Sequence, residues 1–492
     1  MASSSVEKPD PAISYKNDLW GYEVRSSSDD CITFLNKYYI EVLSYGRDKR
    51  VILQAADADN CCALACGLAA VYLWAPQKST TLPPRALIYL TAAKENLVKA
   101  SKYEELVVRA LVAWIEHGSE DALARHFEVL ESYPRDLLTL KRGQTLCFNM
   151  GRSADMLRLA LKALPFNVER GYVFGMLAFA LVEVGSIREG ESAARMALTI
   201  EAQDIWAQHA LCHALEYQCR FKEALTLMNI SCSSWLTRCS FMREHNWWHV
   251  AACQLELGGR SALKTVLYIY DEHIWGSQRV IKNPQTYINA LGLLLRMEIR
   301  VDSSIVQERI LQVVSSLKER AFEHQELLLD LLAIWAFGRA DQPEEAIEMA
   351  ESVKSKVLAV DVYKPSTMQC VISLAAALCE CGRGNLKAVA EILGSTFYTG
   401  NLKVLGASNE QLDVFEDLWC ISSLRAGHVT QVVEVAERLT REKPGISFAW
   451  RVLEEAYSKS GQAPEAIFAG SRARVLELAG EEELLNMSSL YL

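Results

Sequence analysis

Residues 183–225 read EVGSIREGESAARMALTIEAQDIWAQHALCHALEYQCRFKEAL. Apolar residues recur here at the three- and four-residue spacing of an amphipathic helix, and Gly185 and Cys219 interrupt the pattern 34 residues apart. Between these interruptions the sequence reads as a helix, a short turn and a second helix. The FKEAL segment after Cys219 is typical of the start of the next helix. The stretch therefore predicts one unit of a helical repeat.

The same interruption recurs elsewhere in the chain. It falls at Gly118, Gly151, Gly185 and Cys219, and again at Gly427 and Gly461. The steps are 33 or 34 residues in the first group and 34 in the second, and they lengthen to between 39 and 45 in the middle of the chain. A period of 34 built from a helix pair is the tetratricopeptide signature, and strand signals are almost absent. We therefore predict an all-α, tetratricopeptide-like solenoid with degenerate repeats and a right-handed superhelix.

The pattern also suggests how the 492 residues divide into segments. We predict a flexible polar tail over 1–14, an N-terminal helical segment over 15–103, tetratricopeptide-like repeats with a histidine cluster over 104–276, irregular helix pairs over 277–399, and C-terminal tetratricopeptide-like repeats over 400–492.

Composition excludes some classes of partner. Half of the residues are hydrophobic and 23% are charged, which is typical of a folded protein with a large core. The net charge is −10, so there is no basic surface of the kind that binds nucleic acid or an anionic membrane. The longest run without a charged or amide side chain, residues 61–76, is shorter than the roughly 20 residues that span a bilayer. We expect that run to form a helix buried in the protein.

Cysteine usage points to a reducing compartment. The chain has 14 cysteines, most of them in apolar helical stretches, and no Cys-x-x-Cys pair. The first residues lack the apolar core of a secretion signal. We therefore expect a cytoplasmic protein with free thiols.

Histidine is concentrated in one part of the chain. Five of the nine histidines fall between His209 and His273, and four of them form the i,i+4 pairs His209/His213 and His245/His249. Residues four apart lie on one helix face, and Glu216 continues the first stripe. In a solenoid of helix pairs these would be the first helices of adjacent repeats, which line the inner, concave surface.

Three interpretations of this cluster remain open. The histidines could be buried polar residues bonded to Tyr217, Asn246 or Asp271, because buried polar groups need partners. They could instead line a groove in which histidine and the neighbouring tryptophans hold a peptide terminus. The third interpretation is a metal or hydrolytic site, since two His-x-x-x-His pairs on facing helices can supply metal ligands. For that site the candidate ligands are His209, His213, His245 and His249.

A second concentration of polar residues lies at Leu405–Glu416, which reads LGASNEQLDVFE. Ser408 followed by Gln411 is a capping box, so the favoured interpretation is that this motif starts a helix. The functional alternative places Asn409 and Asp413 across the groove from the histidines. The sequence contains no phosphate-binding loop, nucleophile elbow or HExxH motif.

The chain resembles the tetratricopeptide repeat protein 38 family. The resemblance is carried by DIWAQHALCHALEYQCRFKEAL (204–225), REHNWWHVAACQLELGGRSAL (243–263), LYIYDEHIW (267–275) and LGASNEQLDVFEDL (405–418), and it extends faintly from about residue 18 to the C-terminus. It implies degenerate tetratricopeptide repeats in a cytosolic protein and carries no activity with it. In the last motif Ala407, Glu410 and Leu412 depart from the family pattern, which argues against a direct role for that loop.

We therefore expect a non-enzymatic scaffold or adaptor whose concave groove binds a protein segment or a small ligand, without nucleic acid or membrane as partners and without a cofactor. The expected binding residues are His209, His213, Glu216, His245, Asn246, Trp248, His249, Asp271, His273, Asn409 and Asp413. The alternative is a metal-dependent or acid–base enzyme, in which a divalent metal is the cofactor and the paired histidines are its ligands or proton shuttles.

Overall fold

The computed structural model describes residues 14–75, 82–238, 240–276, 283–301, 303–318, 321–359 and 364–487. The polar tail predicted over 1–14 lies outside these ranges, apart from Ser14. The chain forms two compact units, one of residues 1–146 with 158–168 and one of residues 147–157 with 169–492. The segment boundaries expected from the sequence, and the handedness of the superhelix, stay predictions.

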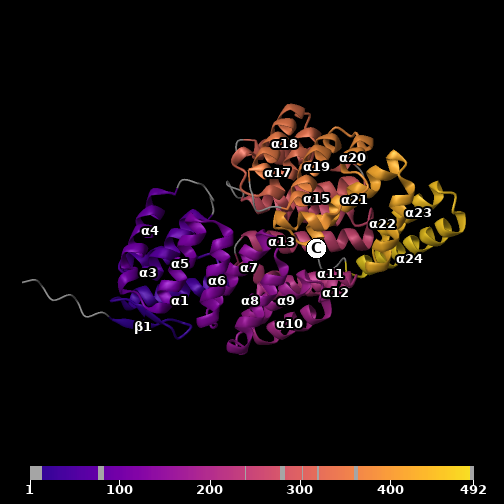
Figure 1. Ribbon diagram of the computed structural model, residues 1–492. Helices are drawn as coiled ribbons and strands as arrows, with labels where there is room; N and C mark the ends of the chain where they lie inside the picture. Colours follow the sequence, from indigo (N-terminus) through magenta and orange to yellow (C-terminus); the bar gives the residue numbers. More distant parts are fainter. Residues whose placement is uncertain are drawn as a thin grey trace, which may run out of the picture. The chain divides into compact units, whose positions relative to one another are not determined.

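The first unit combines a short antiparallel hairpin with helix pairs (Figure 1). Its elements are β1 (Tyr15–Asn17), β2 (Glu23–Arg25), α1 (Asp29–Leu43), α2 (Val51–Ala58), α3 (Ala63–Trp74), α4 (Pro84–Asn96), a 3-10 turn (Leu97–Lys99), α5 (Lys102–Glu116) and α6 (Ser119–Ser132), followed by a 3-10 turn (Leu164–Phe166). In the hairpin Tyr15 pairs with Arg25 and Asn17 with Glu23. The helix α3 and its burial from Ala63 to Val71 confirm the expected buried helix over that part of residues 61–76, whereas Cys61 is exposed and residues 72–75 are half-buried.

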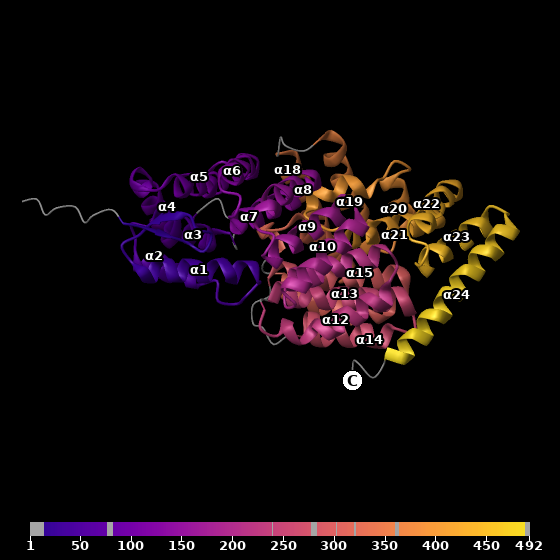
Figure 2. The ribbon, with the colours of Figure 1, turned by 90° about the horizontal axis from the view of Figure 1, so that it is seen from below.

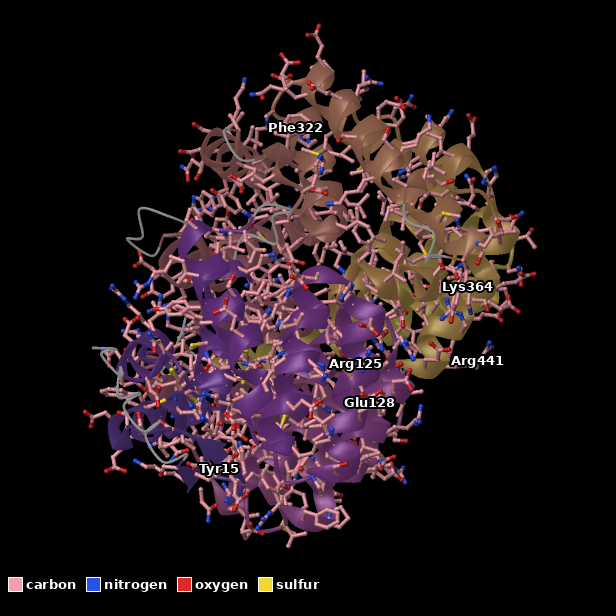
Figure 3. The ribbon with its side chains drawn as sticks, turned by 60° about the vertical axis from the view of Figure 1, so that its left-hand side comes forward. Tyr15, Arg125, Glu128, Phe322, Lys364 and Arg441 are labelled. Atoms are coloured by element: carbon pink, nitrogen blue, oxygen red, sulfur yellow. The ribbon has the colours of Figure 1, made fainter. Side chains whose placement is uncertain are left out.

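Local sequence explains where these helices begin. The Ser28 side chain accepts a hydrogen bond from the Cys31 amide at the start of α1, and Ser101 and Glu104 form a reciprocal capping box at the start of α5. Charged residues occupy the outer faces, as Arg125 and Glu128 do on α6, where their side chains lie 3.4 Å apart (Figure 3).

Two helices, α7 (Leu137–Asn149) and α8 (Ser153–Ala163), are shared between the units. The second unit continues with α9 (Gly171–Glu183), α10 (Ile187–Ile200), α11 (Ile205–Tyr217), α12 (Phe221–Trp235), α13 (Ser240–Gly258), α14 (Leu263–Ile269), a π-helical turn (Tyr270–Trp275), α15 (Pro284–Arg300), a 3-10 turn (Ser303–Ile305), α16 (Gln307–Leu317), a 3-10 turn (Ala321–Glu323), α17 (Leu327–Arg339), α18 (Pro343–Leu358), α19 (Pro365–Gly382), α20 (Leu386–Leu393), a 3-10 segment (Thr399–Leu405), α21 (Asn409–Ala426), α22 (Val429–Glu442), α23 (Ser447–Lys459) and α24 (Ala463–Met487). Figure 2 shows the same helices from below.

The turns between paired helices share one backbone feature. The φ angle is positive at Gly118, Gly151, Gly185, Cys219, Gly427 and Gly461, the six interruptions from which the period was read. A left-handed residue ends one helix and lets the chain turn into the next, and glycine adopts this conformation without strain. The chain is therefore an all-α helical-repeat solenoid, as predicted. Among the described residues, no helix is long and apolar enough to cross a bilayer.

Helices distant in sequence pack together within the second unit. The helix α15 contacts both α13 and α21, and α24 packs on α13 and α23. A buried cluster of charges joins three of these helices, because Arg300 Nε lies 2.8 Å from Asp417 Oδ2 and its Nη1 lies 2.5 Å from Glu256 Oε1. This packing brings the start of α21 to the helices that carry the histidine pairs.

Candidate metal centre

Two adjacent first helices, α11 and α13, carry the clustered side chains. Asp204 caps α11 by accepting hydrogen bonds from the amides of Trp206 and Ala207, which fixes where the helix begins. From that start, His209, His213 and Glu216 fall on one helix face, and His245, His249 and Cys253 form the matching face of α13. The two helices contact each other, and the rings of His209 and His213 on α11 pack against His249 on α13, so the two histidine stripes face each other.

The four imidazole rings pack around one point. The ring centroids of His209 and His213 are 4.4 Å apart, those of His213 and His249 4.4 Å, and those of His245 and His249 4.8 Å. One ring nitrogen from each of the four lies within 4.8 Å of the other three. All four residues are buried, with exposures from 0 to 5%. The histidines therefore converge in the interior and do not line an open surface.

Each of three rings is anchored on its outer side by an oxygen acceptor. His213 Nδ1 lies 2.8 Å from Glu410 Oε2, His245 Nδ1 2.9 Å from Asn289 Oδ1, and His249 Nδ1 3.0 and 3.1 Å from the two oxygens of Glu216. Because carboxylate and amide oxygens accept, the Nδ1–H groups donate to them, and the other ring nitrogen, Nε2, turns toward the cluster. This is how a protein orients metal-ligating histidines.

The inner nitrogens are close together. His213 Nε2 lies 2.9 Å from His209 Nε2, so one of the two carries a proton that the other accepts. His249 Nε2 has no hydrogen-bond partner among residues that the structure describes. A buried, unpartnered imidazole nitrogen is costly unless another group, such as a metal ion, accepts its lone pair.

The electrostatic surroundings of two of the four rings, His213 and His245, shift their pKa values in opposite directions. Burial alone would lower the pKa of His213, but the adjacent Glu410 carboxylate outweighs burial and the pKa is raised above 6.5. The pKa of Glu410 is lowered, since the attraction of His213 outweighs the burial that would raise it. His245, by contrast, has a pKa well below 6.5 because of burial and the nearby His249. The cluster thus holds one protonatable ring and one that stays neutral.

Further ligand-type side chains continue the cluster along the two helices. Cys253 Sγ donates to Glu216 Oε1 at 2.9 Å, and Cys212 Sγ lies 3.7 Å from the same oxygen. Cys212, Glu216 and Cys253 form a second group whose ligand atoms lie within 4.8 Å of one another, and His213, Glu216 and Glu410 form a third. Burial raises the pKa of both thiols, so they are protonated and donate to the carboxylate.

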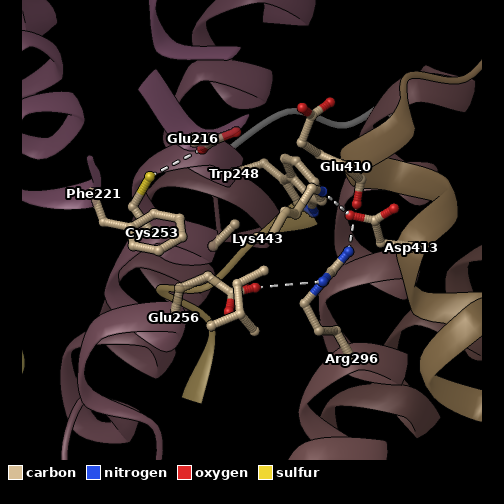
Figure 4. Close-up of a pocket in the computed structure, with 11 residues that line it drawn as sticks. Glu216, Phe221, Trp248, Cys253, Glu256, Arg296, Glu410, Asp413 and Lys443 are labelled. Carbon is tan, nitrogen blue, oxygen red and sulfur yellow. Dashed lines mark hydrogen bonds and ion pairs between the residues drawn. The ribbon is translucent and has the colours of Figure 1, made fainter. Parts of the chain in front are cut away.

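A pocket lies against the carboxylate side of the cluster (Figure 4). Its lining comprises Glu216, Phe221, Trp248, Ala252, Cys253, Glu256, Arg296, Glu410, Asp413, Lys443 and Ile446. Glu216 and Cys253 lie on one side of the pocket in Figure 4, and Glu410 and Asp413 lie on the other. Both carboxylates that orient the histidines therefore border the pocket, while the imidazoles are not part of its lining.

The pocket wall is held by charge pairs. Lys443 Nζ lies 2.6 Å from Asp413 Oδ2, and the pKa of this lysine is raised because Asp413 and Glu410 outweigh the effect of burial. Arg296 donates to the main-chain oxygen of Glu410. These contacts tie the first two turns of α21 to α15 and to Lys443, the residue that follows α22.

The prediction that the buried histidines hydrogen-bond to Tyr217, Asn246 or Asp271 was wrong. Asp271 is paired with Arg309 at 2.5 Å, and Tyr217 lies under Lys443, whose Nζ is 4.8 Å from the ring centroid. Asn246 is fully buried on α13, and its side-chain amide has no hydrogen-bond partner in the described part of the chain. The acceptors are instead Glu410, Asn289 and Glu216, because these side chains project from the helices that face the rings.

The other predicted residues lie around the cluster. Trp248 stacks on His245 at 5.7 Å, whereas His273 stacks on Trp247 at 3.9 Å, away from the four rings. Ser408 is the N-cap of α21, as the motif predicted, and its amide donates to Gln411 Oε1 at 3.2 Å, so Asn409 occupies the first turn of α21, where it is half-buried. Asp413 lines the pocket.

The sequence reasoning missed Glu410, Asn289, Arg296 and Lys443. Glu410 was set aside because it departs from the family pattern, although its place next to a helix start was a usable signal. Asn289, Arg296 and Lys443 carry no local signal. The first two lie on α15 and the third follows α22, and these helices approach the histidines only in the folded chain.

A separate hydrogen-bond chain joins α17 and α18. His324 Nδ1 lies 2.9 Å from Asp330 Oδ2, and Ser352 Oγ lies 2.7 Å from His324 Nε2. The order of groups is that of a serine–histidine–carboxylate relay. His324 and Asp330 border an adjacent pocket, but Ser352 does not line it. We therefore assign these three hydrogen-bonded residues a structural role, which is to hold the segment before α17 against α18.

Comparison with known proteins adds similarity of fold alone. No protein-family model matches the chain. Among solved structures, the human IFIT1 dimer with m7Gppp-AAAA is 14% identical over 92% of this chain and 91% of that one, with a TM-score of 0.36. The P58(IPK) TPR domain is 13% identical over 79% and 98%, with a TM-score of 0.21, and Naa15/Naa10 bound to HypK-THB is 14% identical over 79% and 68%, with a TM-score of 0.23. At these scores the similarities carry no argument about what the chain binds.

Proposed function

We propose that the chain is a metal-binding helical-repeat protein in which His209, His213, His245 and His249 hold one late first-row transition-metal ion. The observation that carries this proposal is the convergence of four buried ring nitrogens within 4.8 Å of one another. Four nitrogens at about 2.1 Å from a tetrahedral ion are about 3.4 Å apart. Small side-chain movements therefore suffice to complete the coordination.

The chemistry of the donor set supports the same conclusion. Imidazole nitrogen suits zinc, copper, iron and nickel, while magnesium and calcium prefer oxygen ligands. The carboxylates of Glu216 and Glu410 orient two of the rings and together carry two negative charges, which balance the charge of a divalent ion bound by neutral imidazoles. A buried dication would otherwise be strongly unfavourable.

Metal content of the purified protein is the direct test. We expect close to one equivalent of metal per chain by elemental analysis, and one equivalent of Co²⁺ or Zn²⁺ bound again after removal by a chelator. His213→Gln and His249→Gln should each reduce the bound metal severalfold. His126→Gln, which changes a buried histidine outside the cluster, serves as the matched control. Folded wild-type protein that neither contains nor takes up any of these metals would overturn the proposal.

We also propose that a protein segment or small ligand binds at the pocket beside the centre and not at the imidazoles themselves. Three residues expected from the sequence to bind a partner, Glu216, Trp248 and Asp413, line this pocket. Binding of peptides on an array should be lost in Asp413→Ala and kept in Glu437→Ala, a half-exposed acidic control outside the pocket. If no peptide binds the wild-type protein, the metal role stands alone.

The net charge of −10 supports a protein or small-molecule partner over nucleic acid. We propose a cytoplasmic location, which is supported by the free thiols of the described cysteines. Catalysis at the metal centre would require a ligand in the adjacent pocket. Glu216 and Glu410 line that pocket and also contact the histidines, so a bound ligand would interact with the centre through these two carboxylates. The metal-dependent enzyme remains the second candidate function for that reason.

A further inference from the structure

The last helix, α24, whose course Figure 2 shows, carries a stripe of side chains that are apolar and exposed. The stripe comprises Ile467 (73% exposed), Phe468 (61%), Val475 (54%), Leu478 (61%) and Leu485 (76%). The opposite face is formed by small residues, among them Ala469 and Ala473, and is fully buried against the neighbouring helices α13 and α23. The helix therefore has two apolar faces, and the described residues of the chain cover one of them.

The spacing of the stripe matches a helix–helix seam. Phe468, Val475, Leu478 and Leu485 are separated by seven, three and seven residues, which places them at the a and d positions of a heptad repeat. The seam is about 25 Å long at 1.5 Å per residue. Single scattered apolar residues on a surface would need no explanation, but four that share the a and d positions of one helix do; Ser471 and Glu482 occupy the other two such positions.

The order of these spacings is the same when it is read in either direction along the helix. Reversing the order of seven, three and seven leaves it unchanged, so an antiparallel copy sets Phe468 against Leu485 of the second chain and Val475 against Leu478. Ser471 then meets Glu482, and its hydroxyl can donate to that carboxylate. A two-fold axis between residues 476 and 477 relates the two helices, and such an interface is closed and self-complementary.

Charge selects the antiparallel arrangement over the parallel one. The first half of the exposed face carries Arg474 and the second half carries Glu481 and Glu482, and all three residues are exposed. In an antiparallel pair, the g positions of the two helices lie on the same side of the seam, so Arg474 of each chain faces Glu481 of the other. A parallel pair would place each acidic end beside its copy, which is repulsive.

We propose that the chain forms a homodimer through an antiparallel coiled coil of two α24 helices, with a second copy of this chain as the occupant of the stripe. This dimer is independent of the metal centre, because none of the four histidines or their hydrogen-bond acceptors lies on α24. It leaves the pocket of each copy with its own residues, because no residue of α24 lines that pocket.

Mass measurement in solution tests the dimer. Sedimentation or light scattering of the wild-type chain at tens of micromolar should give twice the 55.0 kDa chain mass. Val475→Glu and Leu478→Glu should raise the dissociation constant at least tenfold and give monomers. Val98→Glu, at an apolar residue of the first unit that is 93% exposed, is the matched control and should stay dimeric. A wild-type chain that is monomeric throughout this range would overturn the proposal.

A charge exchange tests the orientation without changing the seam. Arg474→Glu sets glutamate against Glu481 of the second chain, and Glu481→Arg sets two arginines together, so each should weaken the dimer severalfold. The double variant restores opposite charges and should recover wild-type association. If the double variant is no better than the single ones, the antiparallel assignment is wrong. Circular dichroism of each variant confirms that the helices are intact.

Discussion

His213 Nδ1 lies 2.8 Å from Glu410 Oε2, although the two residues are 197 positions apart in the chain. The ring is fully buried and the carboxylate nearly so, at 11% side-chain exposure. The contact joins α11 to the first turn of α21 and fixes the orientation of one of the four clustered rings. The orientation of this ring in the cluster therefore depends on how α21 packs against α11.

Glu410→Gln should destabilise the metal-free protein by about 1–3 kcal/mol, because it leaves a buried imidazole with a weaker acceptor. The raised pKa of His213 contributes stability that is complete below pH 6.5 and is lost as the pH rises through the higher folded value. The lowered pKa of Glu410 contributes stability that is present above pH 4.5 and is lost as the pH falls through the lower folded value. The effect of the substitution should therefore be largest between pH 4.5 and 6.5.

Urea unfolding of wild type and Glu410→Gln at pH 5.5 and pH 9, in the presence of a chelator, measures this difference. Glu131→Gln, which removes an exposed negative charge paired with Lys162, provides the control for the same change in net charge. An equal effect of Glu410→Gln at both pH values would show that the pair does not titrate as described.

Metal binding should strengthen as the pH rises. A proton on His213 competes with the ion for the ring, so up to one proton should be released per ion bound when the ring is protonated. Titration of the metal-free protein with Zn²⁺ between pH 5.5 and 8, with a pH indicator, measures affinity and proton release together. In Glu410→Gln the release at pH 6.5 should decrease, because the carboxylate no longer holds the proton on the ring. A pH-independent affinity would contradict coordination by this ring.

The buried His126 of α6 predicts acid sensitivity in the first unit. Burial lowers the pKa of His126 from 6.5 to about 4, and its Nδ1 lies 2.6 Å from the Ala122 carbonyl oxygen. The folded state therefore holds the ring neutral, while the unfolded chain takes up a proton below pH 6.5. Stability should fall by roughly 3 kcal/mol as the pH decreases from 6.5 to 4.

Hydrogen exchange of the α6 amides across this pH range, corrected for the intrinsic exchange rate, measures the loss of stability within the first unit. His126→Leu should remove most of the loss, whereas His117→Leu at an exposed position should leave it in place. If protection in α6 falls equally in both variants, another group is responsible for the acid sensitivity.

The left-handed turn residues predict opposite effects of two substitutions. Gly427 has φ of 88°, and a Cβ at this position would meet no atom within 4 Å, so Gly427→Ala should cost about 1 kcal/mol from backbone strain alone. Asp341 is exposed and has φ of 58°, so Asp341→Gly should stabilise the protein by about 0.5 kcal/mol. Thermal unfolding of both variants measures the two shifts. Shifts of the same sign would contradict a conformational origin.

The sequence by itself determined the class of fold and the local geometry. Gly185 and Cys219 end helices because they take up positive φ, which is a property of one residue and its neighbours. The i,i+4 spacing placed His209 with His213 and His245 with His249 on shared faces, since helical periodicity is local. Ser408 and Gln411 marked the start of α21 for the same reason.

Only the tertiary structure decided that the four rings meet in a buried centre and which acceptors hold them. Asn289 reaches His245 from α15, and Glu410 reaches His213 from α21, through contacts across 44 and 197 positions. Such contacts depend on the small rotation between successive helix pairs, summed over many repeats. The expectation that Asn409 and Asp413 face the histidines came close, but the helix start turned Glu410 toward the ring and Asp413 toward Lys443. No local pattern encodes that rotation.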